Sequence, residues 1–560
     1  MNILGISCYY HDSAACLVKD GVLVAAVQEE RFNRVKNSSD FPINAINFCI
    51  QQGGISFADI DYIAFYEKPY LKFSRYIHDI IEKFPFSYTS FLRNTPQWLQ
   101  DRLILPEVLR REISYKSKVV FIPHHHAHAA SSFFVSDFEK AGIIVNDGVG
   151  EWATSSIGYG NGNNIILENQ ISYPDSLGLL YTCITTFLGF KANSGEGTTM
   201  ALASFGEPNY YEHFRKIIDI KEDGSYRLND KFFSLNKGKK MYSKKMIDLL
   251  GQARKINEDY DKRHKDIAAS LQAVIEEVLI KQARYVSEKY KIQNLALSGG
   301  VFLNCVANQK ILENTNVKKL FIQPGAGDSG AAIGAAFYLY NQILQNDRKF
   351  TYNHSYWGPE FSDKDYEIAI KYNSLSAARY YDDELCEIVA QKIIAKKTVG
   401  WMQGRLEFGP RALGNRSILA SAMYPEMVEI LNSRIKHREW FRPFAPIVKK
   451  ENADDYFHML NDSPFMLLAP KVLEEKKSLI PAVTHIDGTA RVQTVDRDYN
   501  PILWKLLDTH EKHTGIPVII NTSFNLKAEP IVCTPQEAIN DFLKSDMDCL
   551  VLGNYFIEKQ

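Results

Sequence analysis

Short apolar runs separated by polar turns mark the start of the chain. Residues 3–8 form the first run, and residues 15–18 and 22–27 form two more on either side of Lys19-Asp20-Gly21. Two apolar runs joined by a tight turn that contains glycine predict a β-hairpin. We therefore expect an N-terminal strand followed directly by a hairpin.

The same kind of run continues along the chain and alternates with helical spacing. Apolar residues recur at helical spacing from Ile267 to Leu279, which predicts an amphipathic helix over residues 266–288. Four further runs predict buried strands: residues 119–122, 142–146, 295–297 and 399–402. Strands that alternate with helices are typical of an α/β fold.

The chain is too long for a single hydrophobic core. It has 560 residues, and a polar stretch at residues 345–360 precedes a new α/β pattern. We expect two domains, over residues 1–350 and 351–560. Two features of the first domain favour an actin-like ATPase fold: the strand, polar turn and strand at the N-terminus, and a small-residue helix after Asp328. The N-terminal pattern alone is more often a plain hairpin.

Composition and charge limit the class of protein. The formal net charge is -1, so we expect no overall attraction to nucleic acid or to a membrane surface. No run of 18 apolar residues is found, so we expect no membrane-spanning helix. We also find no pattern of a secretory leader. The eight cysteines are scattered without a C-x-x-C pair, which is typical of reduced thiols in a cytoplasmic enzyme.

Three polar segments are expected at the surface. Residues 29–36 form a charged run, which usually marks a solvated face, and residues 229–265 are polar and rich in lysine. Residues 68–116 mix aromatic residues with Lys and Arg at partly helical spacing. That mixture could contact nucleic acid, but ordinary helix faces are the better interpretation.

Four histidines within five positions, from His124 to His128, are the most distinctive feature of the first part. His124 and His128 are four residues apart, so on a helix they lie on one face, where two imidazoles can chelate one divalent ion. Asp147 and Asp328 are flanked by glycines after apolar runs, at the strand ends where open α/β sheets bind ligands. A polar histidine cluster without a metal is the alternative, and the two aspartates favour the metal.

A second set of polar residues lies in the C-terminal part. Glycine-bounded loops carry Arg411 and Arg491, Lys436 is one of four cations within nine residues, and residues 521–523 end an apolar run. Arg binds phosphate oxygens bidentately and Lys binds them as a point charge, so this set suits a polyanion better than surface ion pairs. Gly299-Gly300 follows a predicted strand and would let a phosphate approach the backbone.

Ten motifs follow one another in an order that is specific to a known family. They are Tyr10-His11-Asp12, Glu29–Lys36, His124/His128, Asp147-Gly, Gly299-Gly300-Val-Phe-Leu-Asn304, Gly327-Asp328-Ser-Gly, Glu407-Phe-Gly-Pro-Arg411, Arg442-Pro-Phe-Ala-Pro, Asp487-Gly-Thr-Ala-Arg491 and Asn521-Thr-Ser-Phe-Asn525. From end to end, the chain resembles the O-carbamoyltransferases of natural-product and nodulation-factor biosynthesis, among them the cephamycin, novobiocin and nebramycin carbamoyltransferases.

The resemblance implies a fold and a reaction. The N-terminal domain would be an actin-like (ASKHA) metal-binding domain that transfers the carbamoyl group, and the C-terminal domain would be YrdC-like. ATP, with Mg, and carbamoyl phosphate would give carbamoyl-adenylate in the C-terminal domain. The acceptor would be a hydroxyl of a small-molecule natural product, and a homodimer is compatible with the resemblance.

The resemblance also implies roles for individual residues. His11 would be the general base on the acceptor hydroxyl, and Lys36 would neutralise the leaving adenylate. The metal, Fe(II) or another divalent ion, would be held by His124, His128, Asp147 and Asp328. Nucleotide and carbamoyl phosphate would be held by Gly299, Gly300, Asn304, Arg411, Lys436, Arg491, Asn521, Thr522 and Ser523.

Two other functions remain open at this point. A tRNA threonylcarbamoyl-type transferase would use the same two kinds of domain, but it would need a basic RNA surface, which the net charge of -1 does not favour. A non-catalytic nucleotide-binding scaffold would not need the complete set of four metal ligands.

Overall fold

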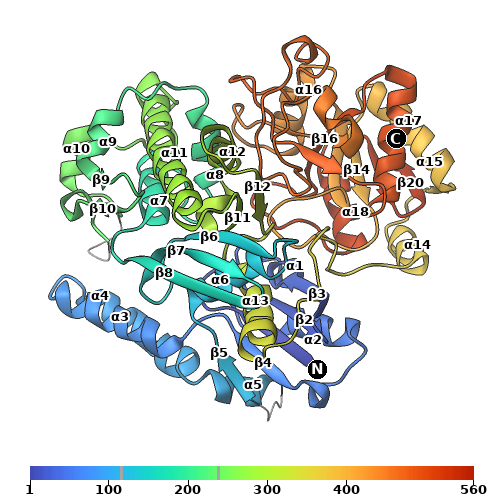
Figure 1. Cartoon of the computed structure of the whole chain (residues 1–560). Helices are drawn as coiled ribbons and strands as arrows, with labels where there is room; N and C mark the ends of the chain where they lie inside the picture. Colours follow the sequence, from blue (N-terminus) through green and yellow to red (C-terminus); the bar gives the residue numbers. More distant parts are fainter. Residues whose placement is uncertain (114–117, 236–239, 560) are drawn as a thin grey trace. The chain divides into compact units, whose positions relative to one another are not determined.

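The computed structural model describes residues 1–113, 118–235 and 240–559, and its internal contacts divide the chain into two compact units (Figure 1). Unit 1 comprises Met1–Glu29 and Asn37–Thr351, and unit 2 comprises Glu30–Lys36 and Tyr352–Gln560. The chain therefore leaves unit 1 after Glu29 and returns to it at Asn37. The short piece in between belongs to unit 2, whereas the domain boundaries expected from the sequence assign it to the N-terminal domain.

Unit 1 contains two five-stranded sheets with corresponding strand orders, β3-β2-β1-β4-β5 and β8-β7-β6-β11-β12. In each sheet the first three strands in sequence are antiparallel, and the last two run parallel to the first. This duplicated topology is that of the actin-like ATPase fold, which confirms the predicted fold class. The strands are β1 (Asn2–Ser7), β2 (Ala14–Lys19), β3 (Val22–Gln28), β4 (Tyr62–Phe65), β5 (Lys118–Phe121), β6 (Lys140–Asn146), β7 (Ala153–Asn161), β8 (Asn164–Ser172), β11 (Asn294–Ser298) and β12 (Lys319–Ile322).

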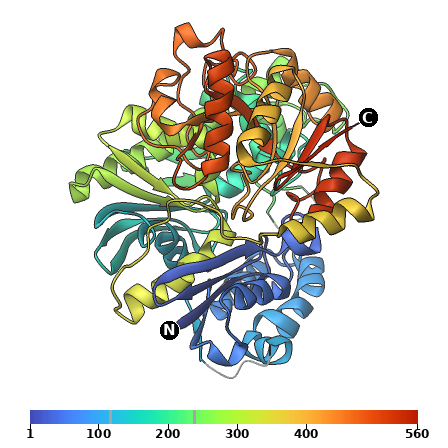
Figure 2. The same cartoon turned by 90° about the vertical axis from the view of Figure 1, so that its right-hand side faces the viewer.

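Two helices lie between these sheets (Figures 1 and 2). The first residue of each is one that the sequence proposes as a metal ligand. Helix α6 (His124–Phe133) packs on β6 and β11, α13 (Asp328–Phe337) packs on β1 and β2, and the helices pack on each other. A Cβ on Gly334 of α13 would lie 1.8 Å from the carbonyl oxygen of Ala127 in α6. Only glycine permits this approach, which agrees with the predicted close packing of the small-residue helix.

Most elements predicted in unit 1 are present. The hairpin is β2 and β3, and the long amphipathic helix is α11 (Lys262–Tyr290). The segment 229–265 is less solvated than expected, because its helix α10 (Lys244–Leu250) buries two apolar side chains; residues 236–239 lie outside the described ranges. The other longer helices are α2 (Ile43–Gln52), α3 (Pro69–Glu82), α4 (Tyr88–Gln97), α5 (Leu105–Ile113), α7 (Leu177–Phe187), α8 (Glu196–Ala203), α9 (Tyr211–Ile217) and α12 (Cys305–Asn314).

Unit 2 is built on a mixed eight-stranded sheet in the order β13-β20-β19-β14-β15-β18-β16-β17. Helices α15 (Asp382–Ile394) and α17 (Pro501–Thr514) pack as one pair, and α14 (Asp363–Tyr372) and α18 (Pro535–Lys544) as another. The predicted strand at 399–402 is the central strand β14. The strands are β13 (Ala378–Arg379), β14 (Val399–Met402), β15 (Arg416–Ser421), β16 (Ala445–Lys449), β17 (Gln493–Val495), β18 (Val518–Ser523), β19 (Cys549–Leu552) and β20 (Tyr555–Glu558).

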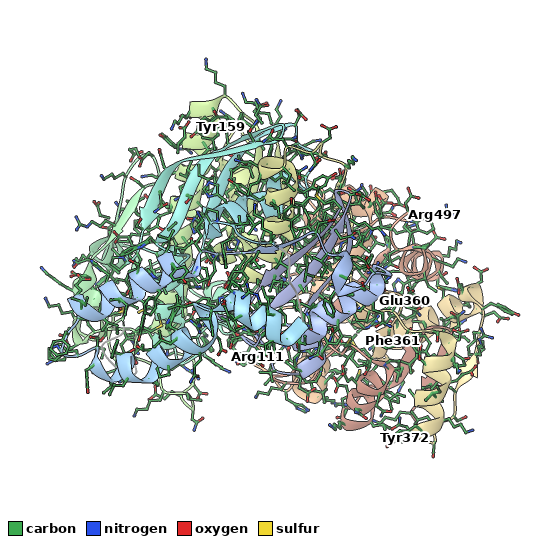
Figure 3. The ribbon with its side chains drawn as sticks, turned by 90° about the horizontal axis from the view of Figure 1, so that it is seen from below. Arg111, Tyr159, Glu360, Phe361, Tyr372 and Arg497 are labelled. Atoms are coloured by element: carbon green, nitrogen blue, oxygen red, sulfur yellow. The ribbon has the colours of Figure 1, made fainter. Side chains whose placement is uncertain are left out.

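Some large apolar side chains stay exposed, both in the region of α3 and α4 in unit 1 and on helices of unit 2. Tyr372, the last residue of α14, is an example, since 80% of its surface is exposed (Figure 3). Among the described residues, no helix is both long enough and apolar enough to cross a membrane.

Candidate metal centre and cationic site

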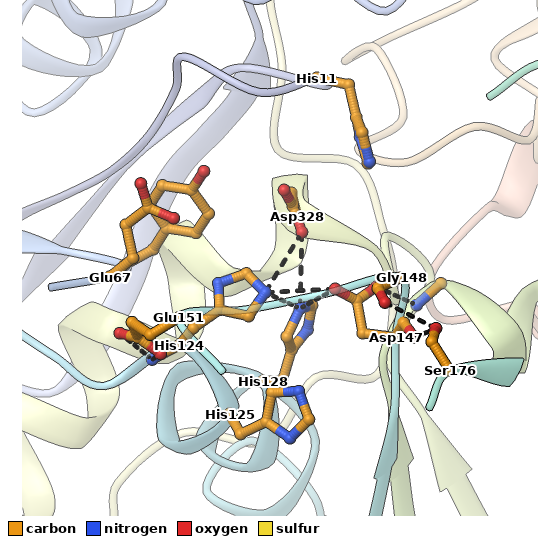
Figure 4. A network of polar contacts seen from close by, with 12 residues as sticks. His11, Glu67, His124, His125, His128, Asp147, Gly148, Glu151, Ser176 and Asp328 are labelled. Atoms are coloured by element: carbon orange, nitrogen blue, oxygen red, sulfur yellow. Dashed lines mark hydrogen bonds and ion pairs between the residues drawn. The ribbon is translucent and has the colours of Figure 1, made fainter. Parts of the chain in front are cut away.

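Four buried side chains of unit 1 converge on one point (Figure 4). His124 and His128 lie one turn apart on α6, Asp147 directly follows β6, and Asp328 begins α13. One ligand atom from each residue lies within 4.8 Å of the others. The structure therefore brings together all four residues that the sequence proposes as metal ligands.

The distances within this group suit a shared cation. The Nε2 atoms of His124 and His128 are 3.1 Å apart, and Asp147 Oδ2 lies 3.3 Å from His124 Nε2. Asp328 Oδ1 lies 3.5 Å from His128 Nε2 and 3.6 Å from His124 Nε2. Beyond these ion pairs, neither carboxylate oxygen of Asp328 has a hydrogen-bond partner among the described residues. Buried carboxylates without donors are costly, and two imidazoles with two carboxylates are a donor set for divalent iron, manganese or zinc.

Protonation of this group opposes metal binding. Burial alone would lower the pKa of His124, but the hydrogen bond with Asp147 and the charge of Asp328 raise it to about 9. The pKa of Asp147 lies well below its usual range, because its contacts with His124 and His128 outweigh burial. A proton and a metal therefore compete for the imidazole, so affinity for the ion should rise with pH.

Two residues that sequence reasoning missed hold His124 in place. The carboxylate of Glu151 accepts the backbone N–H groups of His124, at 3.0 Å, and of Lys68, at 2.8 Å, so it caps the start of α6. The ring of Tyr66 meets the His124 ring edge-on, with centroids 5.3 Å apart. No sequence spacing links these residues to the histidine, since the fold alone brings them together.

The Gly299-Gly300 turn, expected at a nucleotide, contacts the candidate metal ligand Asp147. Gly300 donates its N–H to Asp147 Oδ1 at 3.1 Å. Gly299 has a φ of 95°, and a Cβ there would lie 2.1 Å from the carbonyl oxygen of Asn146. Gly299 is thus needed to bring the backbone against the end of β6, where Asp147 stands, whereas a Cβ on Gly300 would only touch Asp147 Oδ1 at 3.4 Å.

Asn304, also expected at the nucleotide, caps a helix. Its Oδ1 accepts the N–H of Ala307 at 3.0 Å at the start of α12. Its amide also exchanges two hydrogen bonds with Gln272, at 2.8 and 3.2 Å. These bonds use the oxygen and one amide hydrogen, which leaves the second hydrogen for a ligand.

His11 points toward the metal cluster in Figure 4. Its Nδ1 lies 2.9 Å from Asp12 Oδ2, a contact that leaves Nε2 for another partner. Burial lowers the pKa of His11, but Asp328 and Asp12 outweigh it and raise the pKa to about 9. The imidazole therefore feels the charge of the cluster without being one of its four ligands.

Unit 2 gathers positive charge around Lys436, which is buried. Burial, Arg438 and Lys36 together lower the pKa of Lys436 well below its usual range. Burial, Arg442 and Arg491 lower the pKa of Arg438 in the same way, with a smaller contribution from Arg411. Cations that repel one another in a partly buried site are an arrangement that a polyanion would stabilise.

The Lys436 ammonium also organises the end of β18. It donates to the backbone carbonyl of Ser523 and to the Oδ1 and carbonyl of Asn525, at 2.9 and 3.0 Å. The preceding residues belong to β18 itself: Thr522 pairs with Ile418, and the Asn521 side chain donates to Ala412 and Gln493. Of the three residues at this strand end, only Ser523 contacts Lys436.

The loop that carries Arg411 is shaped by a buried carboxylate. Glu407 Oε1 accepts three backbone N–H groups, from Leu413 at 2.8 Å, Asn415 at 2.7 Å and Arg416 at 3.1 Å. Arg416 is fully buried and donates to backbone carbonyls, so it is a structural residue. The predicted polyanion residues Arg411, Lys436, Arg491 and Ser523 therefore all lie in unit 2 and belong to, or adjoin, one group of cations.

Lys36 groups with unit 2, although the expected domain boundaries place it in the N-terminal domain. It contributes to the field at Lys436, and its expected role at the leaving adenylate stays a prediction. The charged run that contains it was expected to be a solvated face, yet Glu30 and Arg31 are buried, with 6% and 1% of their surface exposed. Their charges are paired with each other at 3.0 Å, which is how charged residues become buried.

Comparisons with known proteins cover nearly the whole chain. Residues 2–337 match the family described as carbamoyltransferase N-terminus, and residues 390–559 match carbamoyltransferase C-terminus. Nodulation protein NolNO of Sinorhizobium fredii is 35% identical over 570 residues, which cover 99% of this chain and 79% of that protein. Nodulation protein NolO of Bradyrhizobium diazoefficiens is 34% identical over 453 residues, 78% of this chain and 79% of that protein.

One solved structure shows how distant the structural likeness can be. HypF of T. kodakarensis is 14% identical, covers 60% of this chain and 47% of its own, and has a TM-score of 0.32. The two matched ranges, in contrast, lie in both units and include all four candidate metal ligands as well as the cationic residues from Arg411 to Ser523. The chain belongs to the carbamoyltransferase family and is a transferase.

Proposed function

We propose that this protein is an ATP-dependent O-carbamoyltransferase with two sites. Unit 2 makes carbamoyl-adenylate from carbamoyl phosphate and ATP, and unit 1 transfers the carbamoyl group to a hydroxyl of a small-molecule acceptor. The observation that carries the proposal is the presence of one suitable site in each unit: a buried His₂Asp₂ cluster in unit 1 and a group of cations around Lys436 in unit 2.

The cations of unit 2 suit the first half-reaction. Water would cleave phosphate from carbamoyl phosphate, and an oxygen of the resulting carbamate would attack the α-phosphorus of ATP. Phosphate and pyrophosphate leave, and carbamoyl-adenylate remains. Both substrates and both leaving groups are phosphate anions. Arginine and lysine side chains held by the protein stabilise the negative charge that develops on them. We assign this role to Arg411, Lys436 and Arg491, with Lys36 added from the segment that joins unit 2. A YrdC-like fold for this unit is part of the same proposal.

The residues of unit 1 suit the second half-reaction. The acceptor hydroxyl oxygen attacks the carbamoyl carbon, the bond from that carbon to the adenylate oxygen breaks, and AMP leaves. His11, whose Nδ1 faces Asp12, takes the hydroxyl proton on Nε2. The turn at Gly299 and Gly300 lies beside Asp147 and orients its carboxylate, because the Gly300 N–H donates to Asp147 Oδ1.

A divalent ion at the His₂Asp₂ cluster would act as a Lewis acid and counter-charge for the adenylate phosphate. His124, His128, Asp147 and Asp328 would hold it. Glu151 would orient His124 through its backbone, and Gly300 would orient Asp147. Iron(II) is the ion that the resemblance favours, and ATP would enter with Mg.

The acceptor-independent half of the proposal can be tested first. The protein should exchange labelled pyrophosphate into ATP, and this exchange should require carbamoyl phosphate. Labelled carbamoyl phosphate with ATP and a panel of sugars, aminoglycosides and macrocyclic alcohols should then give a product whose mass has risen by one carbamoyl group. A protein that neither exchanges pyrophosphate nor consumes ATP when carbamoyl phosphate is added would refute the proposal.

A further inference from the structure

We propose that the crossing segment, residues Glu30–Lys36, is a working part of the cationic site in unit 2. This inference rests on the proposed function, because it assigns Arg31 and Arg34 as positioning residues for the adenylate-forming reaction. The segment comes from the N-terminal part of the chain, between β3 and α2, but its contacts are with residues 352–560.

Arg31 holds the loop on one side of the site. Its guanidinium donates to the carbonyl of Gly409 at 2.8 Å, and it pairs with Glu30 at 3.0 Å. Gly409 has a φ of 115° and stands two residues before Arg411. Only 1% of Arg31 is exposed, so this contact is shielded from water and fixes the backbone that leads into Arg411.

Arg34 holds the loop on the other side. Its two terminal nitrogens donate to the carbonyls of Ile531, at 2.7 Å, and Pro530, at 2.9 Å. The same guanidinium pairs with Glu537 at 3.2 Å, and Glu537 in turn accepts the N–H of Cys533 at 2.7 Å. Arg34 therefore fixes the far end of the loop that starts at Ser523.

The start of that loop, at Ser523 and Asn525, is the part that would contact the bound phosphate anion. Asn525 accepts from Lys436, and its own amide donates to the carbonyl of Glu529 at 2.7 Å. The loop is thus held at Ser523 and Asn525 by Lys436 and at Pro530 and Ile531 by Arg34. Release of one end would allow the other to move, because only a few residues separate the two anchors.

Lys36 completes the segment and adds charge. It follows Arg34 by two positions and is close enough to help lower the pKa of Lys436. Seven residues therefore supply one anchor to each flanking loop and one cation to the centre. Residues 352–560 alone would lack all three, so adenylate formation should need the N-terminal part of the chain.

Arg34 is the residue to test, because Arg31 is fully buried and its loss could prevent folding. In the full-length protein, Arg34→Ala should raise the KM for carbamoyl phosphate in pyrophosphate exchange at least about tenfold, with a smaller change in kcat. It should weaken binding of inorganic pyrophosphate, measured by calorimetry, to a similar degree. Millimolar guanidinium, but not ammonium, should restore both, since only guanidinium can donate to two carbonyls at once.

Arg254→Ala is the matched control. Arg254 also donates to backbone carbonyls, those of Leu188, Ile256 and Glu258, but it lies in unit 1. Its loss should leave pyrophosphate exchange and binding unchanged.

The outcomes separate this inference from the proposed function. If Arg34→Ala matches the wild type in KM and in pyrophosphate affinity, the role of the crossing segment is refuted. If the wild type shows no exchange, the proposed reaction fails, and pyrophosphate affinity alone decides the inference: weaker binding by Arg34→Ala supports it and equal binding overturns it. A wild type that neither exchanges nor binds pyrophosphate overturns both.

Discussion

At the scale of single residues, the four candidate metal ligands of unit 1 lead to a prediction about metal content. Asp328→Ala removes a carboxylate whose Oδ1 faces both histidines, so the purified variant should lose at least about tenfold in affinity for a divalent ion. Metal analysis and calorimetric titration with Fe(II), Mn(II) or Zn(II) would measure this. His126→Ala is the matched control, because His126 lies on the same helix but packs on Tyr338. Full metal occupancy in the Asp328 variant would rule out the ligand set.

His11 makes a second prediction, which concerns pH. As a base it must be neutral, so turnover of supplied carbamoyl-adenylate should rise with pH until His11 is deprotonated. Without a metal ion, Asp328 and Asp12 hold its pKa at about 9 against burial. A divalent ion would offset the charge of Asp328, so the rising limb should move to lower pH when the metal is bound.

His11→Asn should slow that turnover by roughly 10²–10⁴-fold and remove the rising limb of the pH profile. Pyrophosphate exchange in unit 2 should not change, which serves as the control for folding. An unchanged pH profile in His11→Asn would mean that another group is the base.

At the scale of elements, the turn after β11 combines a strained backbone position, Gly299, with a hydrogen bond from Gly300 to the candidate metal ligand Asp147. Gly299→Ala would force a side chain onto a φ of 95° and against the carbonyl of Asn146. We expect a loss of about 1–3 kcal/mol in the free energy of unfolding from the backbone alone, and weaker metal binding because Gly300 holds Asp147.

Gly197→Ala is the control for this turn. Gly197 lies on helix α8, and a Cβ there would meet no atom within 4 Å. Alanine is favoured over glycine in a helix, so this variant should be as stable as the wild type or more stable by up to about 1 kcal/mol. Equal melting temperatures for the two variants would contradict the account of the turn.

The elements show why the convergence of the four candidate ligands could be predicted from sequence. His124 and His128 are four positions apart, a helical spacing that is visible in the sequence. Asp147 and Asp328 are each next to a glycine after an apolar run. These are local patterns, and the actin-like topology then brings the starts of α6 and α13 and the end of β6 together. Glu151 has no such pattern, because its link to His124 is a backbone contact across 27 residues.

At the scale of the whole molecule, sequence reasoning failed for the crossing segment. A run of charged residues usually lies in solvent. Here Glu30 and Arg31 are buried because they pair with each other and Arg31 reaches a backbone carbonyl, Arg34 is half-buried against two more carbonyls, and Lys36 is exposed. Those carbonyls belong to residues 409, 530 and 531, which no local pattern connects to residues 30–36. The grouping of Lys36 with unit 2 was not foreseen for the same reason.

The central claim is that the two half-reactions occupy different units. Arg491→Ala and Asp147→Ala test it most directly, since Arg491 lies among the cations of unit 2 and Asp147 in the metal cluster of unit 1. Each variant would be assayed for pyrophosphate exchange and for carbamoylation of an acceptor from supplied carbamoyl-adenylate. We predict that Arg491→Ala loses exchange but still uses carbamoyl-adenylate, and that Asp147→Ala does the reverse. If Arg491→Ala cannot use supplied carbamoyl-adenylate, the two steps share one site and the account is wrong.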